Sequence, residues 1–464
     1  IWLGTEKGLT IINPDESIEI IRQNFVDKNK LNDNAVYDIL CDRDGNIWVG
    51  TYFGGINVLP KKNELFNWIE PGYGNNNLRG KAIRKIIEPV PGTLWIASED
   101  GGLNILDTAT GQIDLFNKIP SLGHNIHDIF LDNEMSTIWI GTFRNGLFTY
   151  NLRTHQYNRY LPKDNTGIPS DAVFQTVKQH NGTIWVGTTQ GLRKFDPKTQ
   201  SFAKPNHPAL DFNFIYCMLV DNNDNVWVGT RNFGLFCIDS STNEIIEWGE
   251  NSFTDKYITC LFQSDDGTIW IGTNNNGVQF IDKNSQTPTH LTLDVTLLNC
   301  TVCNIIADNS NCVWFSTNQG LYRYNRTRNE ITRFTAEDGI PSNQFNFASG
   351  ILASNGMLYF GSVNGLISFN PDMISTHHQQ FDVHLRRLTI DDIPQTSLTD
   401  GSPLVQNIDD TESITLSYNQ SRSFSIEYAV VAIGSSNSIN YQVRLVGVDK
   451  EWRNVGTERK FVGS

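Results

Sequence analysis

The sequence predicts an all-β protein built from repeated four-stranded propeller blades, and three observations lead to this fold class. One motif centred on Trp recurs nine times at intervals of 42 to 47 residues, which is the length of one blade. Gly and aromatic residues are frequent and only four Met occur, as is typical of short strands joined by tight turns. No run of eighteen apolar residues is present, so the pattern favours strands over a membrane span.

The nine copies share a Trp strand, a Thr or Ser, and a Gly before the following strand, with Tyr359 replacing Trp in the last copy. They begin at Ile1, Ile47, Leu94, Ile138, Ile184, Val226, Ile269, Val313 and Leu358. Propellers close with four to eight blades, so nine copies are too many for one ring. Counting seven copies back from the last reaches Trp95, although the period by itself also allows six or eight blades.

Each unit is expected to be a β-meander of four strands. In the unit around Trp48 we expect an innermost strand over 36–40, the Trp strand, a third strand over 56–59 and a weaker outer strand over 65–69. Turns such as Asn181-Gly182 join the first two strands, because Gly supplies the positive φ that a short hairpin needs.

The Trp strand is apolar on both of its faces, as in Ile47, Trp48 and Val49. A strand of this kind must be covered on both sides, and neighbouring blades provide that cover. We therefore expect the Trp side chains to hold adjacent blades together.

Three domains follow from the repeat. Residues 1–74 are expected to be the last two blades of an N-terminal propeller, and residues 75–376 a seven-bladed propeller. After His378 the repeat gives way to alternating segments at 414–418, 423–430 and 440–452. Period-two alternation predicts that residues 380–464 form a partial immunoglobulin-like β-sandwich.

Charge and motifs exclude several classes of function. The formal charge of −14 is spread along the chain without a basic stripe, so nucleic-acid binding is not expected and a neutral or cationic partner fits better. The seven cysteines lack the spacing of a disulfide framework and are expected to be buried thiols. The Asp-rich turn at 221–225 has only part of a calcium-loop pattern. No hydrolase, metalloprotease, phosphate-loop or dinucleotide motif occurs, so we expect no catalytic residue, metal or cofactor.

The loops after the Thr or Ser give a first candidate site. Longer loops contain Tyr52 and Phe53, Glu99 and Asp100, Phe143, Arg144 and Asn145, Arg231, Asn232 and Phe233, and Asn274, Asn275 and Asn276. Equivalent loops emerge at one end of a ring, so we expect them to share one face. Aromatic rings with Arg and Asn form the usual site for a neutral glycan. The alternative is that these are polar turns, with Phe143 or Phe233 packing on a neighbouring blade.

The innermost strands give a second candidate site. Four residues before each turn stand Arg84, Asp128, Gln175, Cys217, Cys260, Asn304 and Ser349. If these residues face the axis, Arg84, Asp128, Gln175 and Asn304 are further candidates for ligand binding. The alternative is a water-filled channel without a ligand.

The repeated IWxGTxxGL unit, the segments GIPSNQFNF and YFGSVNGLISFNP, and the downstream Tyr418, Tyr428 and Tyr441 resemble the periplasmic sensor region of Bacteroides-type hybrid two-component systems. The resemblance covers essentially the whole chain. It implies two seven-bladed propellers and a three-tyrosine sandwich, here truncated at both ends. It also implies a downstream membrane helix, histidine kinase and regulator outside this sequence, and an oligosaccharide as the ligand.

The sequence therefore predicts a non-enzymatic extracytoplasmic sensor fragment, part of a periplasmic region that works as a homodimer in the parent receptor. Its glycan would signal across the membrane to polysaccharide-utilisation genes. Two alternatives from other classes are a propeller hydrolase or lyase acting on polysaccharide and a protein-binding scaffold. Fold alone does not choose between them.

Overall fold

The computed structural model describes residues 1–13, 16–24, 30–42, 45–59, 65–74, 76–205, 207–248, 253, 255–283, 285, 287–376, 383–430, 439 and 441–463. The chain divides into two units, residues 64–377 and residues 1–63 with 378–464, and each is described by itself.

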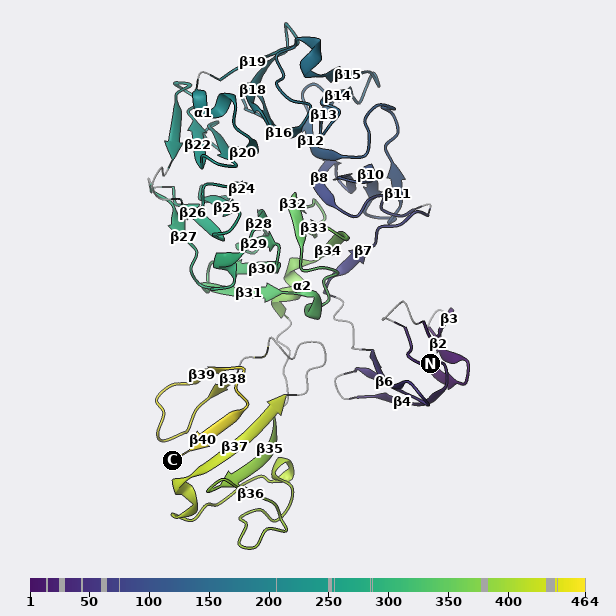
Figure 1. The fold of residues 1–464 in the computed structure, drawn as a ribbon, viewed down its shortest axis with the longest axis vertical. Helices are drawn as coiled ribbons and strands as arrows, with labels where there is room; N and C mark the ends of the chain where they lie inside the picture. Colours follow the sequence, from purple (N-terminus) through teal and green to yellow (C-terminus); the bar gives the residue numbers. More distant parts are fainter. Residues whose placement is uncertain are drawn as a thin grey trace. The chain divides into compact units, whose positions relative to one another are not determined.

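Residues 64–377 form a ring of seven four-stranded antiparallel sheets around a central axis (Figure 1). The innermost strands are β8 (Ile83–Val90), β12 (Ile126–Asp132), β16 (Val173–Lys178), β20 (Ile215–Val220), β24 (Ile258–Gln263), β28 (Val302–Ala307) and β32 (Phe345–Leu352). The second strands, which carry the Trp motif, are β9 (Thr93–Ser98), β13 (Thr137–Thr142), β17 (Ile184–Thr188), β21 (Val226–Thr230), β25 (Ile269–Thr273), β29 (Cys312–Thr317) and β33 (Leu358–Ser362). The all-β prediction with a seven-bladed propeller is confirmed.

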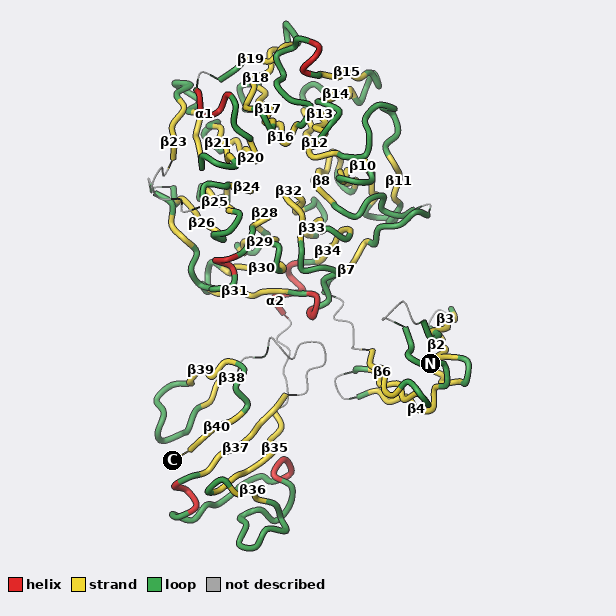
Figure 2. Tube along the Cα trace, in the orientation of Figure 1, coloured by secondary structure: helices red, strands yellow, loops and turns green. Residues whose placement is uncertain are grey.

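The third strands are β10 (Gly102–Asp107), β14 (Leu147–Asn151), β18 (Gly191–Asp196), β22 (Leu235–Ile238), β26 (Val278–Ile281), β30 (Gly320–Asn325) and β34 (Gly365–Phe369). Six sheets end in β11 (Ile113–Leu115), β15 (Tyr157–Tyr160), β19 (Ser201–Ala203), β23 (Ile245–Trp248), β27 (Thr289–His290) and β31 (Glu330–Phe334). Helical turns are few (Figure 2): α1 (Pro208–Asp211), α2 (Pro371–Thr376) and 3-10 turns at Pro162–Asp164, Leu297–Asn299 and Ala336–Asp338.

The outer strand of the seventh sheet comes from the start of the unit. Strand β7 (Asn67–Ile69) pairs with β34 of the last blade, and Phe66 beside it packs on Phe334 and Phe369 at ring-centroid distances of 5.5 and 5.0 Å. We expected 65–69 to complete the sheet around Trp48 and the domain boundary to fall at 74/75. The structure corrects both: pairing to β34 places this segment in the seven-bladed ring, whose unit begins at residue 64. The expected boundary residues 75, 380 and 464 lie outside the described residues.

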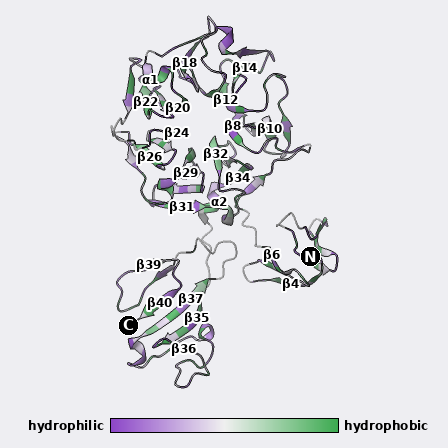
Figure 3. Ribbon diagram, viewed as in Figure 1, coloured by the Kyte–Doolittle hydropathy of each residue, from purple (hydrophilic) through white to green (hydrophobic). Residues whose placement is uncertain are grey.

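The Trp motif forms the packing between blades, as predicted. Trp270 and Trp314 are at most 2% exposed, and apolar residues are concentrated on the strands of the ring (Figure 3). In several blades the indole nitrogen is also hydrogen-bonded, although that of Trp139 has no partner among the described residues. Trp227 Nε1 donates to Asp221 Oδ2 at 2.9 Å and Trp314 Nε1 donates to Asp308 Oδ2 at 2.8 Å. The Asp-rich turn that resembled part of a calcium loop is therefore a cap for the indole and its own hairpin.

Residues 1–59 form two three-stranded sheets. The first contains β1 (Trp2–Thr5), β2 (Gly8–Ile12) and β3 (Ile18–Ile21), and the second β4 (Val36–Cys41), β5 (Ile47–Thr51) and β6 (Gly55–Leu59). Both have the strand order of propeller blades, and Leu9 and Val49 lie in their shared core.

Residues 383–463 form a four-stranded sheet in the order β36-β35-β37-β40 and a two-stranded sheet, β38-β39. The strands are β35 (Val383–Ile390), β36 (Ile393–Gln395), β37 (Phe424–Val430), β38 (Tyr441–Val443), β39 (Arg453–Gly456) and β40 (Lys460–Gly463), with 3-10 turns at Ile408–Asp410 and Gln420–Arg422. The expected strand at 423–430 is present. The segment 414–418 is not a strand. Of the described residues 441–452 in the third segment, only 441–443 form a strand, because the backbone N–H of Leu445 donates to Asp449 Oδ2 in a turn.

All seven cysteines are free thiols, and six of them are buried. Within the described ranges, no helix is long and apolar enough to cross a membrane.

Candidate ligand-binding site

The innermost strands share a β-bulge near their first residue. The strand register shifts at the same place in six blades, and the extra residues are Arg84, His127, Phe174, Tyr216, Thr259 and Cys303. A bulge turns one side chain out of the regular alternation and increases the local twist. These six positions therefore form a set that strict alternation along a strand does not predict.

The loops after the second strands are held at the same end of the ring as these bulges. The backbone N–H of the first loop residue donates to the carbonyl just before the innermost strand of its own blade. The pairs are Glu99 to Ala82 at 2.9 Å, Phe143 to Asn125 at 3.2 Å, Arg231 to Phe214 at 3.1 Å and Asn274 to Tyr257 at 3.1 Å. The four longer loops of this ring thus share one end of the propeller, which we call the mouth, whereas the loop with Tyr52 and Phe53 belongs to the other unit.

Aromatic side chains from several blades meet at the mouth. They are Phe143, Phe174, Phe214, Tyr216, Tyr257 and Phe347, which we call the mouth cluster together with His127, Arg84 and Arg231. Ring centroids are 4.5 Å apart for Phe174 and Phe214, 5.0 Å for Tyr216 and Tyr257, and 5.3 Å for Tyr216 and Phe347. Such edge-to-face pairs give the mouth a continuous aromatic floor.

Arg84 is embedded in this floor. Its Cζ lies 5.5 Å from the ring centroids of Phe174 and Tyr216 and 5.3 Å from that of Phe347. The residue is 3% exposed, and its Nε makes no hydrogen bond within the described part of the chain. The nearest carboxylate oxygen, Glu99 Oε1, is 3.8 Å from Nε, which is too far for a hydrogen bond.

Arg231 presents a second guanidinium, and this one is exposed. Its Cζ lies 5.8 Å from the centroid of Phe214 and 5.7 Å from that of Tyr257. Cation–π contacts of this length orient the guanidinium while leaving its N–H groups available. Because Tyr216 and Tyr257 touch, Arg84 and Arg231 are separated by only two rings.

His127 closes the floor beside Phe143, on which it stacks at 5.1 Å. Burial and the nearby Arg84 guanidinium lower the pKa of His127 to about 3, so the imidazole is neutral near pH 7. Burial also raises the pKa of Tyr216 and of Tyr257, which therefore stay protonated.

Two of the polar residues predicted to line the axis, on the innermost strands, make hydrogen bonds to neighbouring strands. Asp128 Oδ2 accepts the backbone N–H of Thr176 at 2.7 Å, and Gln175 bonds both the N–H and the carbonyl of Met218 at 2.6 and 2.9 Å. These bonds join β12 to β16 and β16 to β20, and they account for both side chains. Asn304 on β28 lies beside Gly350 on β32, the next innermost strand of the ring.

Arg84 does not belong to that ring. The residue equivalent to Asp128 is Lys85, since Lys85 pairs with Ala97 as Asp128 pairs with Gly141. A second irregularity between Ile87 and Val90 lengthens β8 near its turn, so counting back from the turn gives a position one residue off.

The other predicted loop residues surround the mouth cluster. Arg144, Asn232, Phe233 and Asn275 are exposed, and Asn274 is half-buried, with its carbonyl accepting the hydroxyl of Thr301 at 2.6 Å. Phe143 and Arg231 are the loop residues that join the cluster. Sequence reasoning missed His127, Phe174, Phe214, Tyr216, Tyr257 and Phe347. The available signal was the aromatic residue that recurs one position before the polar ring, in Phe174 and Tyr216.

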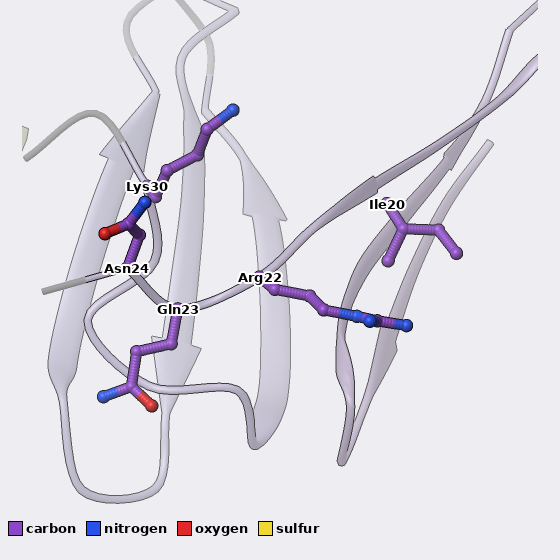
Figure 4. A pocket seen from close by; sticks show the side chains of 5 residues that line it. All are labelled: Ile20, Arg22, Gln23, Asn24 and Lys30. Atoms are coloured by element: carbon purple, nitrogen blue, oxygen red, sulfur yellow. The ribbon is translucent and has the colours of Figure 1, made fainter. Parts of the chain in front are cut away.

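Two hollows lie elsewhere. One of about 440 Å³ in the N-terminal segment is lined by Ile20, Arg22, Gln23, Asn24 and Lys30, whose cationic side chains do not converge on one point (Figure 4). One of about 240 Å³ lies at the hairpin end of β12 and β16, where Lys178 is paired with Asp132 and Glu134. Over the described ranges, no group of three or more His, Cys, Asp or Glu side chains is placed to hold a metal ion.

The groups at the mouth are suited to binding, and His127 is not a base near neutral pH. Aromatic faces accept sugar rings, and guanidinium and amide groups bond hydroxyl or anionic groups. A base near neutral pH needs a pKa close to 7, and the pKa of His127 is about 3.

Comparisons with known proteins agree with this fold. The family model described as two component regulator propeller matches residues 30–53, 209–232 and 252–275, so the chain carries two-component regulator propeller repeats. A curated relative, Histidine kinase P4 of Formosa agariphila, is 26% identical over 339 residues. That match covers 70% of this chain and 25% of the kinase, so this chain spans about a quarter of the relative's length.

Solved structures share the fold. The extracellular domain of a protein described as a hybrid two-component system from B. thetaiotaomicron superposes with a TM-score of 0.74 at 22% identity, covering 99% of this chain and 61% of that domain. A complex of virginiamycin B lyase from Staphylococcus aureus with quinupristin gives a TM-score of 0.52 at 14% identity, covering 65% of this chain and 98% of the lyase.

Proposed function

We propose that this chain, with its two-component regulator propeller repeats, is a ligand-sensing part of the extracytoplasmic region of a hybrid two-component histidine kinase. Its ligand is an oligosaccharide bound at the mouth of the seven-bladed propeller. In the parent receptor, a homodimer in the periplasm, binding signals across the inner membrane to polysaccharide-utilisation genes.

The observation that carries the proposal is the mouth cluster. Six aromatic rings from five blades, flanked by Arg84 and Arg231, give flat apolar faces beside fixed hydrogen-bond donors. Glycan binding needs this combination, because sugar rings have apolar faces and polar edges. The Asn side chains around the mouth, Asn232, Asn274 and Asn275, add groups for hydroxyl recognition.

The similar proteins support the part of the proposal that concerns signalling. Histidine kinase P4 is about four times as long as the segment matched here, which is consistent with a sensor region joined to a kinase. The likeness to an extracellular domain of a hybrid two-component system supports an extracytoplasmic location.

An enzyme is the second candidate, because a lyase shares the propeller fold. The side chains at the mouth favour glycan binding without catalysis over an enzyme. His127 is too weak a base at neutral pH, and Asp128 is held by the backbone of the next blade.

The test is calorimetric titration of the 464-residue chain against defined plant and host oligosaccharides, with product analysis of each mixture. We expect one glycan class to bind without cleavage. Phe143→Ala should weaken that binding roughly tenfold, because a central aromatic contact is lost. Tyr157→Ala, on the outermost strand β15, is the matched control and should leave the affinity unchanged. Cleavage of an oligosaccharide would establish the enzyme instead. If no oligosaccharide in the panel binds, a protein ligand is favoured.

A further inference from the structure

The mouth has a charge that the whole chain does not have. The sequence contains 50 acidic and 36 basic residues, yet the mouth cluster contains two guanidinium groups, and one carboxylate, that of Glu99, approaches Arg84. Two other carboxylates near the loops are engaged by backbone N–H groups: Asp100 bonds Lys81 N at 2.9 Å, and Asp255 bonds Asn275 N at 2.6 Å. The net charge of the whole chain favours a neutral or cationic partner, but the two guanidinium groups at the mouth favour an anionic one.

One donor of Arg84, its Nε, has no hydrogen-bond partner among the described residues. Glu99 Oε1 is 3.8 Å from Arg84 Nε and 4.0 Å from His127 Nε2, so Glu99 is near both groups and hydrogen-bonded to neither. Arg84 Nε, His127 Nδ1 and Asn125 Oδ1 are all buried and make no hydrogen bond to any described residue. Buried polar atoms are normally hydrogen-bonded, so these three atoms, which lie in two adjoining blades, are available to a ligand or to water.

Glu99 differs from its neighbours in exposure. Its side chain is 33% exposed, whereas that of Arg84 is 4% exposed and that of His127 9%. The Glu99 side chain therefore contacts both solvent and the surroundings of the buried Arg84 guanidinium. No hydrogen bond to Arg84 has to break when Glu99 moves away, and an incoming anionic group replaces its negative charge.

We infer that the ligand of the mouth is an acidic glycan, one of whose carboxylate or sulfate groups replaces Glu99 against Arg84. Arg231, two rings away, binds a second anionic group of the same oligosaccharide. This inference rests on the proposed function and narrows it to a substrate class.

An anionic group fits Arg84 better than a hydroxyl does. Hydrogen bonds between ionised partners are shorter and about twice as strong as neutral ones. The aromatic rings around Arg84 also exclude water, and a buried cation is strongly stabilised by a partner of opposite charge. Glu99 provides that charge in the free protein, but at a distance that leaves the hydrogen bonds unmade.

The test uses two small anions as probes, sodium sulfate and sodium glucuronate, titrated at constant ionic strength against chloride. Glu99→Gln removes the competing charge with little change in shape. Binding of either anion should tighten roughly five- to tenfold in this variant. Glu134→Gln changes the net charge equally at the hairpin end of β12, where Glu134 is 78% exposed, and should leave anion binding unchanged. Arg231→Gln should weaken the binding of a glucuronate oligomer more than that of glucuronate itself.

Identical anion binding by the wild-type chain and Glu99→Gln overturns the inference, as does an equal gain in Glu134→Gln. Failure of the inference is distinguishable from failure of the proposed function. If the panel yields a neutral glycan whose affinity Glu99→Gln reduces, the sensor stands and the acidic class is wrong. If no glycan binds while Glu99→Gln tightens sulfate binding, the anion site stands and the glycan proposal fails. Two pairs of oligomers identify the anionic group that binds. One pair is a uronate oligomer and its carboxyl-reduced form, and the other is a sulfated galactan and its desulfated form.

Discussion

His127 and Asp128 are adjacent on β12, both are buried, and burial acts on them in opposite directions. It lowers the pKa of His127 to about 3 and raises that of Asp128 to about 6. In each case burial disfavours the charged form, which is the cation of His and the anion of Asp. The stability of the propeller should therefore depend on pH in a way that two substitutions can separate.

Asp128→Asn should change the pH dependence of unfolding between pH 4 and 6. The unfolded Asp ionises near pH 3.8 and the folded one near 6, so the wild-type chain loses about 3 kcal/mol of stability as the pH rises through this interval. The Asn variant lacks this loss. Urea unfolding at a series of pH values should show the difference in free energy between wild type and variant falling as the pH rises.

The matching substitution His127→Gln should give the opposite slope. Unfolded His takes up a proton below pH 6.5 while folded His127 does not, so the wild type loses stability as the pH falls from 6.5 towards 3. Constant offsets from altered packing cancel in the slopes. Two slopes of the same sign would show that burial does not set these pKa values.

At the scale of the element, the bulge explains where residue counting along the sequence fails. Alternation places Asp128, Gln175 and Asn304 correctly in one ring, because the strand is regular between the bulge and the turn. It misplaces Arg84, where a second irregularity near Pro89 adds a residue. The recurring aromatic residues Phe174 and Tyr216 are visible in the sequence, but their meeting in one aromatic floor is not, because a bulge has no reliable composition signal.

Strand β7 shows the same limit for domain boundaries. It has neither Trp motif nor turn glycine, so the sequence offered only its position after the Trp48 unit as a guide to its partner. Its actual partner β34 is chosen by ring closure, which is a long-range effect.

Phe66→Ala should destabilise the seven-bladed ring by about 3–5 kcal/mol, because it removes a buried ring from between Phe334 and Phe369. The measurement is denaturant unfolding of the 464-residue chain, followed by Trp fluorescence. Tyr73→Ala is the matched control in the same segment, since Tyr73 is 91% exposed, and should change stability by less than about 0.5 kcal/mol. Equal effects of the two substitutions would contradict the assignment of this segment to the ring.

At the scale of the whole molecule, every residue of the mouth cluster lies within the unit of residues 64–377. The excised unit should therefore bind the glycan found with the 464-residue chain with a Kd within about twofold. Calorimetry on both chains measures this. A loss of more than tenfold in the shorter chain would mean that residues outside 64–377 contribute to the site.

The sequence period predicted the seven sheets, the role of Trp and the shared end of the loops, because each depends on a signal repeated in every blade. The site was predicted in part. Phe143 and Arg231 were named from their loops, but their meeting with Arg84 depends on how seven blades converge, which no single repeat encodes.

The pairing of β7 with β34 also has a consequence for how the protein is made. Asn67 on β7 and Ser368 on β34 are bonded across 301 residues of sequence, so these two paired strands are among the first and last parts of the ring to leave the ribosome. At about 5–20 residues per second, β7 waits roughly 15 to 60 s for its partner. During that time six blades can form, but the circle stays open with an unpaired strand at its edge. The ring can therefore close only after its last blade has been translated.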